Sequence, residues 1–183
     1  LPLNEWQNRL KDGGLKEPLE RLYGDGDGAE AAAARYEKAL SSFEERFGQR
    51  EAALLSAPGR CELGGNHTDH QQGLVLAAAI DLDIVAVAGK REDGCIHILS
   101  QTGQEVRFLE IDGRDLFPRE REIHTSHALI RGVAAGFSRR GLTAGGFDAY
   151  LTSNIPWGAG LSSSAAFEVL TGGILNALYN ENT

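Results

Sequence analysis

The stretch Asn154-Ile155-Pro156-Trp157-Gly158-Ala159-Gly160-Leu161-Ser162-Ser163-Ser164-Ala165-Ala166 says most about fold and function, because it lies between a strand pattern and a helix pattern. Its two glycines allow a backbone conformation and a close approach that a β-carbon would prevent. Its three serines place hydroxyls at the start of the helix, where backbone N–H groups are unpaired and the helix dipole is positive. The stretch therefore predicts an anion site, most naturally for phosphate.

Other phosphate-binding and nucleophile motifs fit this stretch poorly. A Walker A loop needs a lysine before its serine or threonine, and residues 155–183 contain no lysine. A dinucleotide fingerprint needs glycine where Ser163 stands and belongs after the first strand of a βαβ unit. A nucleophile elbow needs Gly-x-Ser-x-Gly, which is absent. A serine-capped helix without a ligand is the structural alternative, and the full thirteen-residue string disfavours it.

A second polar stretch, residues 57–73, reads APGRCELGGNHTDHQQG. Proline and several glycines predict tight turns. Arg60, Asn66, His67 and Asp69 supply a cation, an amide, an imidazole and a carboxylate close together. Such mixed donors and acceptors suit a hydroxyl-rich ligand such as a sugar. The arginine is suited to stabilise charge on a transferred phosphoryl group.

Two alternatives stay open for this second stretch. Cys61, His67 and His70 suggest zinc but lack a fourth ligand. The acidic and amide side chains could also simply cap a surface turn. Elsewhere in the chain, His97, His124 and His127 are interpreted as packing or capping residues.

Hydrophobic periodicity predicts an α+β class rather than a regularly wound α/β fold. Pro58 and Gly59 are expected to end the first strand, and residues 91–94 to join the second and third strands in a hairpin. The last strand alternates as a half-buried strand does. The predicted helices are 29–47, 124–140 and 162–179, and the predicted strands are 52–57, 80–90, 95–100, 104–111 and 147–152.

Composition narrows the functional classes. The 183 residues carry 18 Lys and Arg against 26 Asp and Glu, a net charge of −8, which gives no general attraction to nucleic acid or an anionic membrane. The longest apolar stretch, residues 74–88, is interrupted by two aspartates and is too short to span a bilayer. Residues 1–14 show no signal-peptide pattern and the two cysteines predict no disulfide framework, so a cytoplasmic location is expected. The absence of methionine suggests a piece of a longer product.

Together the two motifs resemble those of galactokinases, a branch of the GHMP family of small-molecule kinases. Residues 58–73 resemble the galactokinase signature, and residues 155–168 resemble the family's phosphate-binding loop. The resemblance covers most of the chain after about Phe43. It implies an α+β GHMP kinase N-terminal domain, similar to ribosomal protein S5 domain 2, over residues 51–183. Residues 1–50 would form a helical segment before it, and the ferredoxin-like C-terminal domain would be missing.

The resemblance also implies ATP and Mg²⁺ as cofactors and assigns residues to them. Arg60 matches the arginine that stabilises the transferring phosphate, Ser164 matches the metal-contacting serine, and Ser100 falls near the nucleotide. The residues matching the triphosphate loop are Gly158, Ala159, Gly160, Leu161, Ser162, Ser163 and Ser164. Those matching the galactose-binding run are Asn66, His67, Thr68 and Asp69.

The implied activity is that of an ATP-dependent sugar-1-kinase, which transfers the γ-phosphate to the anomeric hydroxyl of galactose or a related sugar. The catalytic Asp and an acidic magnesium ligand come from beyond the matching end, so residues 1–183 alone are expected to be inactive. Asn66 and His70 stand where galactokinases carry Glu and Tyr, and Cys61-Glu62-Leu63-Gly64 replaces Val-Asn-Leu-Ile. Weak galactose binding, or preference for a related sugar, is therefore expected.

Two other functions remain as alternatives. One is a non-catalytic homologue that senses sugar and ATP and acts through a protein partner, which the missing charge at Asn66 keeps open. The other is a different small-molecule kinase of the same family, which explains the phosphate loop but explains residues 60–73 poorly.

Overall fold

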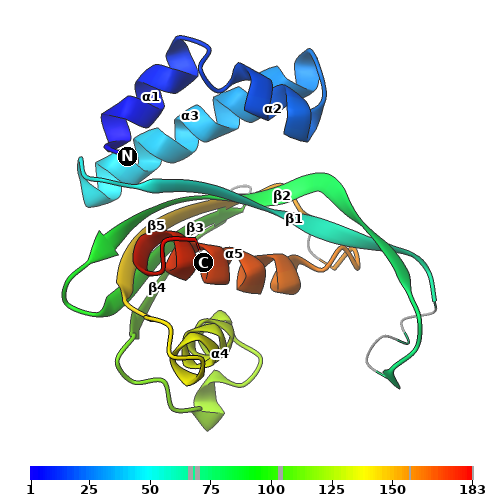
Figure 1. Ribbon diagram of the computed structural model, residues 1–183, viewed down its shortest axis with the longest axis vertical. Coiled ribbons are helices and arrows are strands. Elements are labelled where there is room, and N and C mark those ends of the chain that lie inside the picture. The colour runs from blue at the N-terminus through cyan, green and yellow to red at the C-terminus, as the bar shows by residue number, and fades with distance from the viewer. Residues whose placement is uncertain (66–67, 69–70, 103–104, 157, 183) are drawn as a thin grey trace.

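The computed structural model describes residues 1–65, 68, 71–102, 105–156 and 158–182, and it shows a five-stranded mixed sheet with helices on both faces (Figure 1). Three helices from the first fifty residues cover one face, and two helices from later in the chain cover the other. The predicted α+β class is confirmed. In chain order the elements are α1 (Leu3–Lys11), α2 (Lys16–Tyr23), α3 (Asp27–Phe47), β1 (Ala53–Gly64), β2 (Leu76–Arg91), β3 (Cys95–Thr102), β4 (Glu105–Asp112), the 3₁₀ helix η2 (Glu120–Glu122), α4 (Ser126–Arg139), β5 (Gly146–Ser153) and α5 (Ser163–Tyr179).

All three helices predicted from periodicity are present, and α1 and α2 precede them. Helix α3 buries one stripe of side chains that includes Tyr36, Leu40 and Phe43. It ends at Gly48, whose φ of +77° suits glycine and stops the helix. Helix α1 is fixed to the sheet by the indole N–H of Trp6, which donates to the Ala52 carbonyl at 2.9 Å. The first fifty residues therefore form a layer on the sheet.

The strand order β1-β2-β5-β3-β4 corrects the predicted hairpin. Strand β5 lies between β2 and β3, antiparallel to the first and parallel to the second. Residues 91–94 therefore carry the chain across β5 rather than reversing it within one ladder. The hydrogen-bonded hairpin is instead β3 with β4, in which Cys95 pairs with Asp112. An Asp-Gly turn favours a hairpin only through local sequence. Strand β5, which comes much later in the chain, takes the place beside β2 that the predicted hairpin gives to β3.

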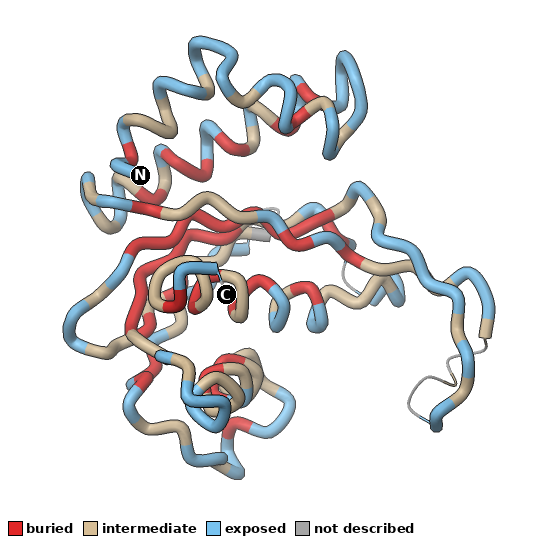
Figure 2. The backbone as a smooth tube through the Cα atoms, in the orientation of Figure 1, coloured by how far each residue is buried: buried red, intermediate tan, exposed pale blue. Residues whose placement is uncertain are grey.

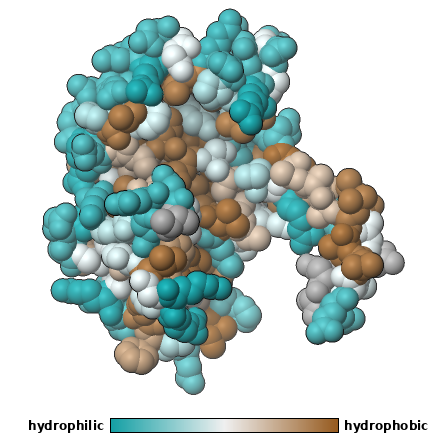
Figure 3. All heavy atoms as spheres, viewed as in Figure 1, coloured by the Kyte–Doolittle hydropathy of each residue, from teal (hydrophilic) through white to brown (hydrophobic). Residues whose placement is uncertain are grey.

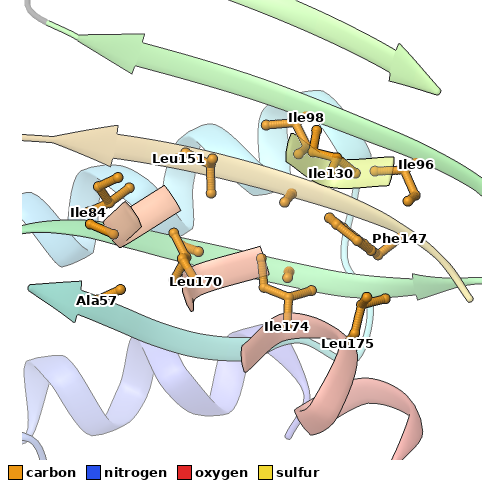
Figure 4. Close-up of a cluster of buried hydrophobic side chains, with 14 of the residues drawn as sticks. Ala57, Ile84, Ile96, Ile98, Ile130, Phe147, Leu151, Leu170, Ile174 and Leu175 are labelled. Carbon is orange, nitrogen blue, oxygen red and sulfur yellow. The ribbon is translucent and has the colours of Figure 1, made fainter. Parts of the chain in front are cut away.

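Two apolar cores lie on opposite faces of the sheet (Figure 2). On β2, Ile84, Ala86 and Ala88 face α4 and α5, while Val85 and Val87 face the first three helices. Figure 4 shows the first core, where side chains of α5 and Ile130 of α4 meet those of the sheet. Burial on both faces explains the unbroken apolar sequence of β2.

Strand β5 is buried on both faces and not half-buried as its alternation predicts. Tyr150 packs in the core formed with α1–α3, and Asp148 is fully buried beside it. The Asp148 carboxylate accepts hydrogen bonds from Arg50 at 2.7 Å and Arg91 at 2.8 Å. These two partners satisfy the buried charge, so a polar residue can occupy an inner face.

Strand β1 continues through Pro58 and Gly59 instead of ending there. It is an edge strand, where a proline without an N–H is tolerated, and the register shifts between Pro58 and Arg60. Residues 60–64 and 76–79 extend the β1–β2 pair beyond the other strands as a two-stranded ribbon, here called the arm (Figures 1 and 3). The arm carries exposed apolar side chains, among them Leu63 and Leu76.

Acid is expected to destabilise the chain partly through Glu122. This buried carboxylate accepts a hydrogen bond from Arg131 of α4 at 2.7 Å, which holds the pKa of Glu122 below its usual range. Because the pKa is lower in the folded state, the ionised carboxylate stabilises the fold at pH values above the unfolded pKa. This stabilisation is lost as the pH falls through the folded pKa. We expect Glu122→Gln to be less stable than wild type at neutral pH, and to lose less stability between about pH 5 and pH 3.

Urea unfolding followed by circular dichroism across this pH range measures the effect. The matched control is Glu120→Gln, because Glu120 is exposed on the same short helix. An acid dependence equal to that of wild type in Glu122→Gln would contradict the assignment.

Candidate functional site

The glycine-rich loop, residues 154–162, joins β5 to α5. Gly158 and Gly160 have φ values of +71° and +72°, so both use the left-handed region that favours glycine. Ser162 is the N-cap of α5 and is also left-handed, with φ +59°, and its hydroxyl makes no capping hydrogen bond. The N–H groups of the first turn of α5 are therefore not capped by that serine and can serve a ligand.

The two sequence motifs meet in the structure. The backbone N–H of Arg60, in β1, donates to the carbonyl of Leu161 in the glycine-rich loop at 3.0 Å. Gly59 is buried at this contact, and a β-carbon there would lie 2.8 Å from the same Leu161 oxygen. Glycine is thus required at position 59 for the strand and the loop to approach each other.

A cavity of about 420 Å³ lies beside the start of α5. Its size falls within the range of small-molecule sites. Its lining mixes apolar side chains with polar and charged ones, and it includes Ser163 and Ser164 from the first turn of α5. A nucleotide combines an apolar base with hydroxyls and phosphates, so these residue types fit a nucleotide. The lining residues are Ile84, Ser100, Glu105, Arg107, Leu109, His124, Thr125, Ser126, His127, Leu129, Leu151, Ser153, Ile155, Ser163, Ser164 and Phe167.

The structure brings together only part of the predicted site. Ser100, Ser163 and Ser164 line the cavity, and Arg60 contacts the loop through Leu161. Gly158, Ala159 and Gly160 are exposed along the loop before it. Thr68 lies beyond the arm, where its hydroxyl donates to the Gly65 carbonyl at 2.8 Å. Asn66, His67, Asp69 and His70 lie outside the described residues.

The Arg60 side chain forms an ion pair along its own strand. Its Nη1 donates to Oε2 of Glu62 at 3.2 Å. The Arg60 side chain is 39% exposed, whereas that of Glu62 is only 5% exposed. Residues two apart on a strand share a face, so β1 itself sets this pairing. Part of the guanidinium charge is therefore balanced by Glu62, while the backbone of Arg60 contacts the loop.

Three residues that line the cavity, His124, His127 and Arg107, are not predicted as site residues from the sequence. His124 and His127 were expected to pack or cap, but Thr125 is the N-cap of α4 and both histidines line the cavity. His124 also has an unusual φ of +63°. Arg107 lines the cavity on the same face of β4 as Leu109. The alternation of β4 predicts that Arg107 and Leu109 share a face. It does not predict which face of the strand lies against the rest of the protein, because that depends on where the helices pack.

No group of three or more His, Cys, Asp or Glu side chains suited to a metal ion occurs within the described ranges. Both cysteines, Cys61 and Cys95, are free thiols. None of the helices in the described part of the chain is long and apolar enough to cross a membrane.

Comparisons with known proteins agree with this geometry. Residues 128–183 match the GHMP kinases N terminal domain, and residues 41–90 match the galactokinase galactose-binding signature. Fold and site thus define the N-terminal domain of a GHMP kinase, a family that uses ATP. Within that family, the chain belongs with the galactokinases. The resemblance stated from the two motifs is confirmed.

Individual relatives support this placement. Galactokinase from Lacticaseibacillus casei (strain BL23) is 37% identical over 139 residues, which are 75% of this chain and 35% of that protein. The structure of Lactococcus lactis galactokinase complexed with galactose has a TM-score of 0.63 and 28% identity, over 81% of this chain and 37% of that one. Methanococcus jannaschii mevalonate kinase shares the fold, with a TM-score of 0.54, 16% identity, and coverage of 69% and 40%. The chain spans about a third of the length of the curated relatives.

Proposed function

We propose that the chain is the ATP- and sugar-binding N-terminal part of a sugar-1-kinase. The complete protein would transfer the γ-phosphate of ATP to the anomeric hydroxyl of galactose or a related sugar. The observation that carries this proposal is the 3.0 Å hydrogen bond from Arg60 to Leu161, because it joins the galactose-binding signature to the glycine-rich loop. A sugar kinase needs its two substrates side by side, and this contact gives the two motifs a common anchor.

Each element of the site has a role in this reaction. ATP would occupy the cavity with its phosphates toward Ser163, Ser164 and the loop backbone, and with Ser100 near the nucleotide. Ser164 would contact the Mg²⁺ that neutralises phosphate charge. Arg60 would stabilise charge developing on the transferring phosphoryl group, held in position by Glu62. Asn66, His67, Thr68 and Asp69 would bind the sugar.

The remaining groups would come from the rest of the protein. The matched galactokinases are roughly twice as long as this chain, since 139 residues are 35% of their length, and we infer that a C-terminal domain supplies the catalytic Asp and an acidic magnesium ligand. Phosphoryl transfer depends on positioned charges, so the 183 residues alone would bind ATP without turning it over. We further propose a cytoplasmic location, consistent with two free thiols.

ATP binding to the purified chain tests this proposal. We expect isothermal titration with Mg-ATP to show binding, and Ser164→Ala to weaken it by up to about tenfold, the cost of a lost hydrogen bond. Ser138→Ala is the matched control, because Ser138 is an exposed helical serine of α4 outside the cavity. Absence of ATP binding at millimolar concentration would contradict the proposal.

A non-catalytic sensor of sugar and ATP is the second candidate. The ion pair with Glu62 favours it, because part of the Arg60 charge is balanced before any phosphate arrives. Sugar-dependent release of ADP by the complete protein would favour the kinase. Binding of both ligands without ADP release would favour the sensor.

A further inference from the structure

Asn154, the first residue of the glycine-rich loop, makes two hydrogen bonds to one residue of β2. Its backbone N–H donates to the Asp83 carbonyl at 3.2 Å, and its side-chain Oδ1 accepts the Asp83 N–H at 2.7 Å. The β2–β5 ladder ends at the previous pair, Ile84 with Ser153. Asn154 thus continues the ladder with its side-chain carbonyl in the place of its backbone carbonyl. The backbone is released to turn into the loop while the strand end stays attached.

Asp83 is a rigid point of attachment. It is 2% exposed, and its carboxylate accepts hydrogen bonds from Tyr23 of α2, Arg35 of α3 and Ser56 of β1. Burial raises the pKa of Tyr23, with the Asp83 carboxylate as a further cause, so this hydroxyl stays protonated and donates. Three elements therefore hold the residue to which the loop is joined.

The loop is fixed at both ends. Asn154 holds its beginning to β2, and the Leu161 carbonyl holds its end to β1 through Arg60. Between these points Gly158 and Gly160 are left-handed, and the residues that the structure describes there form no helix or strand. Asn154 itself is exposed, so its side chain contributes little apolar packing, and the bridge to Asp83 is what it adds.

We propose that Asn154 is a positioning residue for nucleotide phosphate, acting through Asp83, and this inference rests on the proposed function. Without the side-chain acceptor, the Asp83 N–H loses its partner and the loop entrance is held by one hydrogen bond instead of two. The phosphate-binding turn then samples other conformations, and each productive binding event has to order it again. ATP affinity falls, while the two apolar cores remain intact.

Titration of Mg-ATP into the 183-residue chain tests the inference with three substitutions. Asn154→Ala removes the acceptor, Asn154→Gln moves it by one methylene, and Asn154→Asp keeps it in place. We expect the alanine and glutamine variants to bind ATP about five- to tenfold more weakly. The aspartate variant should bind close to wild type at raised salt, which screens the added charge. Asn8→Ala, an exposed asparagine of α1, is the control.

Hydrogen exchange at the Asp83 amide gives a readout independent of ATP. Exchange should be fast in the alanine and glutamine variants and slow in wild type and Asn154→Asp, with the thermal midpoint changed by only a few degrees. If Asn154→Ala does not fold, the glutamine and aspartate variants decide. Fast exchange with unchanged ATP affinity would overturn the inference alone. Failure of wild type to bind ATP would overturn the proposed function and the inference with it.

Discussion

Gly59→Val is expected to abolish detectable ATP binding by the chain. The β-carbon would lie 2.8 Å from the Leu161 oxygen, 3.2 Å from Cδ1 of Ile80 and 3.3 Å from Cδ1 of Ile155. The oxygen belongs to the backbone and cannot rotate away as a side chain would. Valine must therefore push the glycine-rich loop from β1 and break the hydrogen bond from Arg60 to Leu161. The end of the loop that leads into α5 then loses its attachment to β1.

Alanine at the same position should give an intermediate result. Overpacking by a single methyl group typically costs about 1–3 kcal/mol, so we expect Gly59→Ala to fold with a lower thermal midpoint and weakened ATP binding. The two branches of valine add a larger clash. Isothermal titration measures affinity and calorimetric unfolding measures stability in the same preparations.

Gly64→Ala is the matched control, because this glycine lies in the same strand and a β-carbon there meets no atom of the described residues within 4 Å. It should bind ATP as wild type does. Normal ATP binding by Gly59→Val would show that the phosphate site does not depend on contact with β1. The main argument for a shared sugar and nucleotide site would then be lost.

Local chemistry made the glycine-rich loop predictable. Glycines, three serines and the apolar period of α5 stand within one short stretch, so strand, turn and helix follow from neighbours in the sequence. The resemblance places Ser100 near the nucleotide, which stays a prediction, and the structure shows Ser100, Ser163 and Ser164 lining one cavity. The likeness to galactokinases supplied that position, since nothing local to β3 distinguishes Ser100.

The strand order could not be predicted in the same way. The Asp-Gly turn after β2 favours a hairpin locally, whereas pairing with β5 is decided by burial of Val85, Val87 and Tyr150 under the first three helices. The same layer hides Asp148, which alternation placed on an exposed face. Cover by distant helices is a tertiary property, and it altered both predictions.

The packing of helices α1 and α2 on the sheet could not be predicted from the sequence either. They are short and highly charged, and their buried side chains are essentially Leu3 and Leu19. Isolated helices of this length are marginal in water, so their stability comes from contact with α3 and the sheet. Sequence patterns predicted a helical segment over residues 1–50 but gave no indication that it shares a core with residues 51–183.

Deleting residues 1–50 is expected to prevent the rest of the chain from folding. The deletion removes the helical side of one core and exposes Val85, Val87 and Tyr150, which are 0%, 0% and 2% exposed in the intact chain. Full burial of each such side chain contributes roughly 1.5–3 kcal/mol, while a whole domain is stable by only about 5–15 kcal/mol. The deletion also removes the conformational entropy cost of ordering α1–α3. The sheet, however, still has to be ordered, now without the apolar contacts that these helices provide.

The shortened chain, residues 51–183, should therefore give a poorly dispersed NMR spectrum and no cooperative unfolding transition. Adding the 1–50 peptide in trans is the informative control, because it restores both the apolar cover and the Tyr23 and Arg35 partners of Asp83. Recovery of dispersion with the peptide would show that the layer acts through contact. Cooperative folding of residues 51–183 alone would instead make them an autonomous domain, with the boundary that the sequence suggests. In that case ATP affinity, measured with and without the peptide, would separate the two contributions of the helical layer. Unchanged affinity would confine that layer to stability, whereas weakened affinity would trace its influence through Asp83 and Asn154 to the phosphate site.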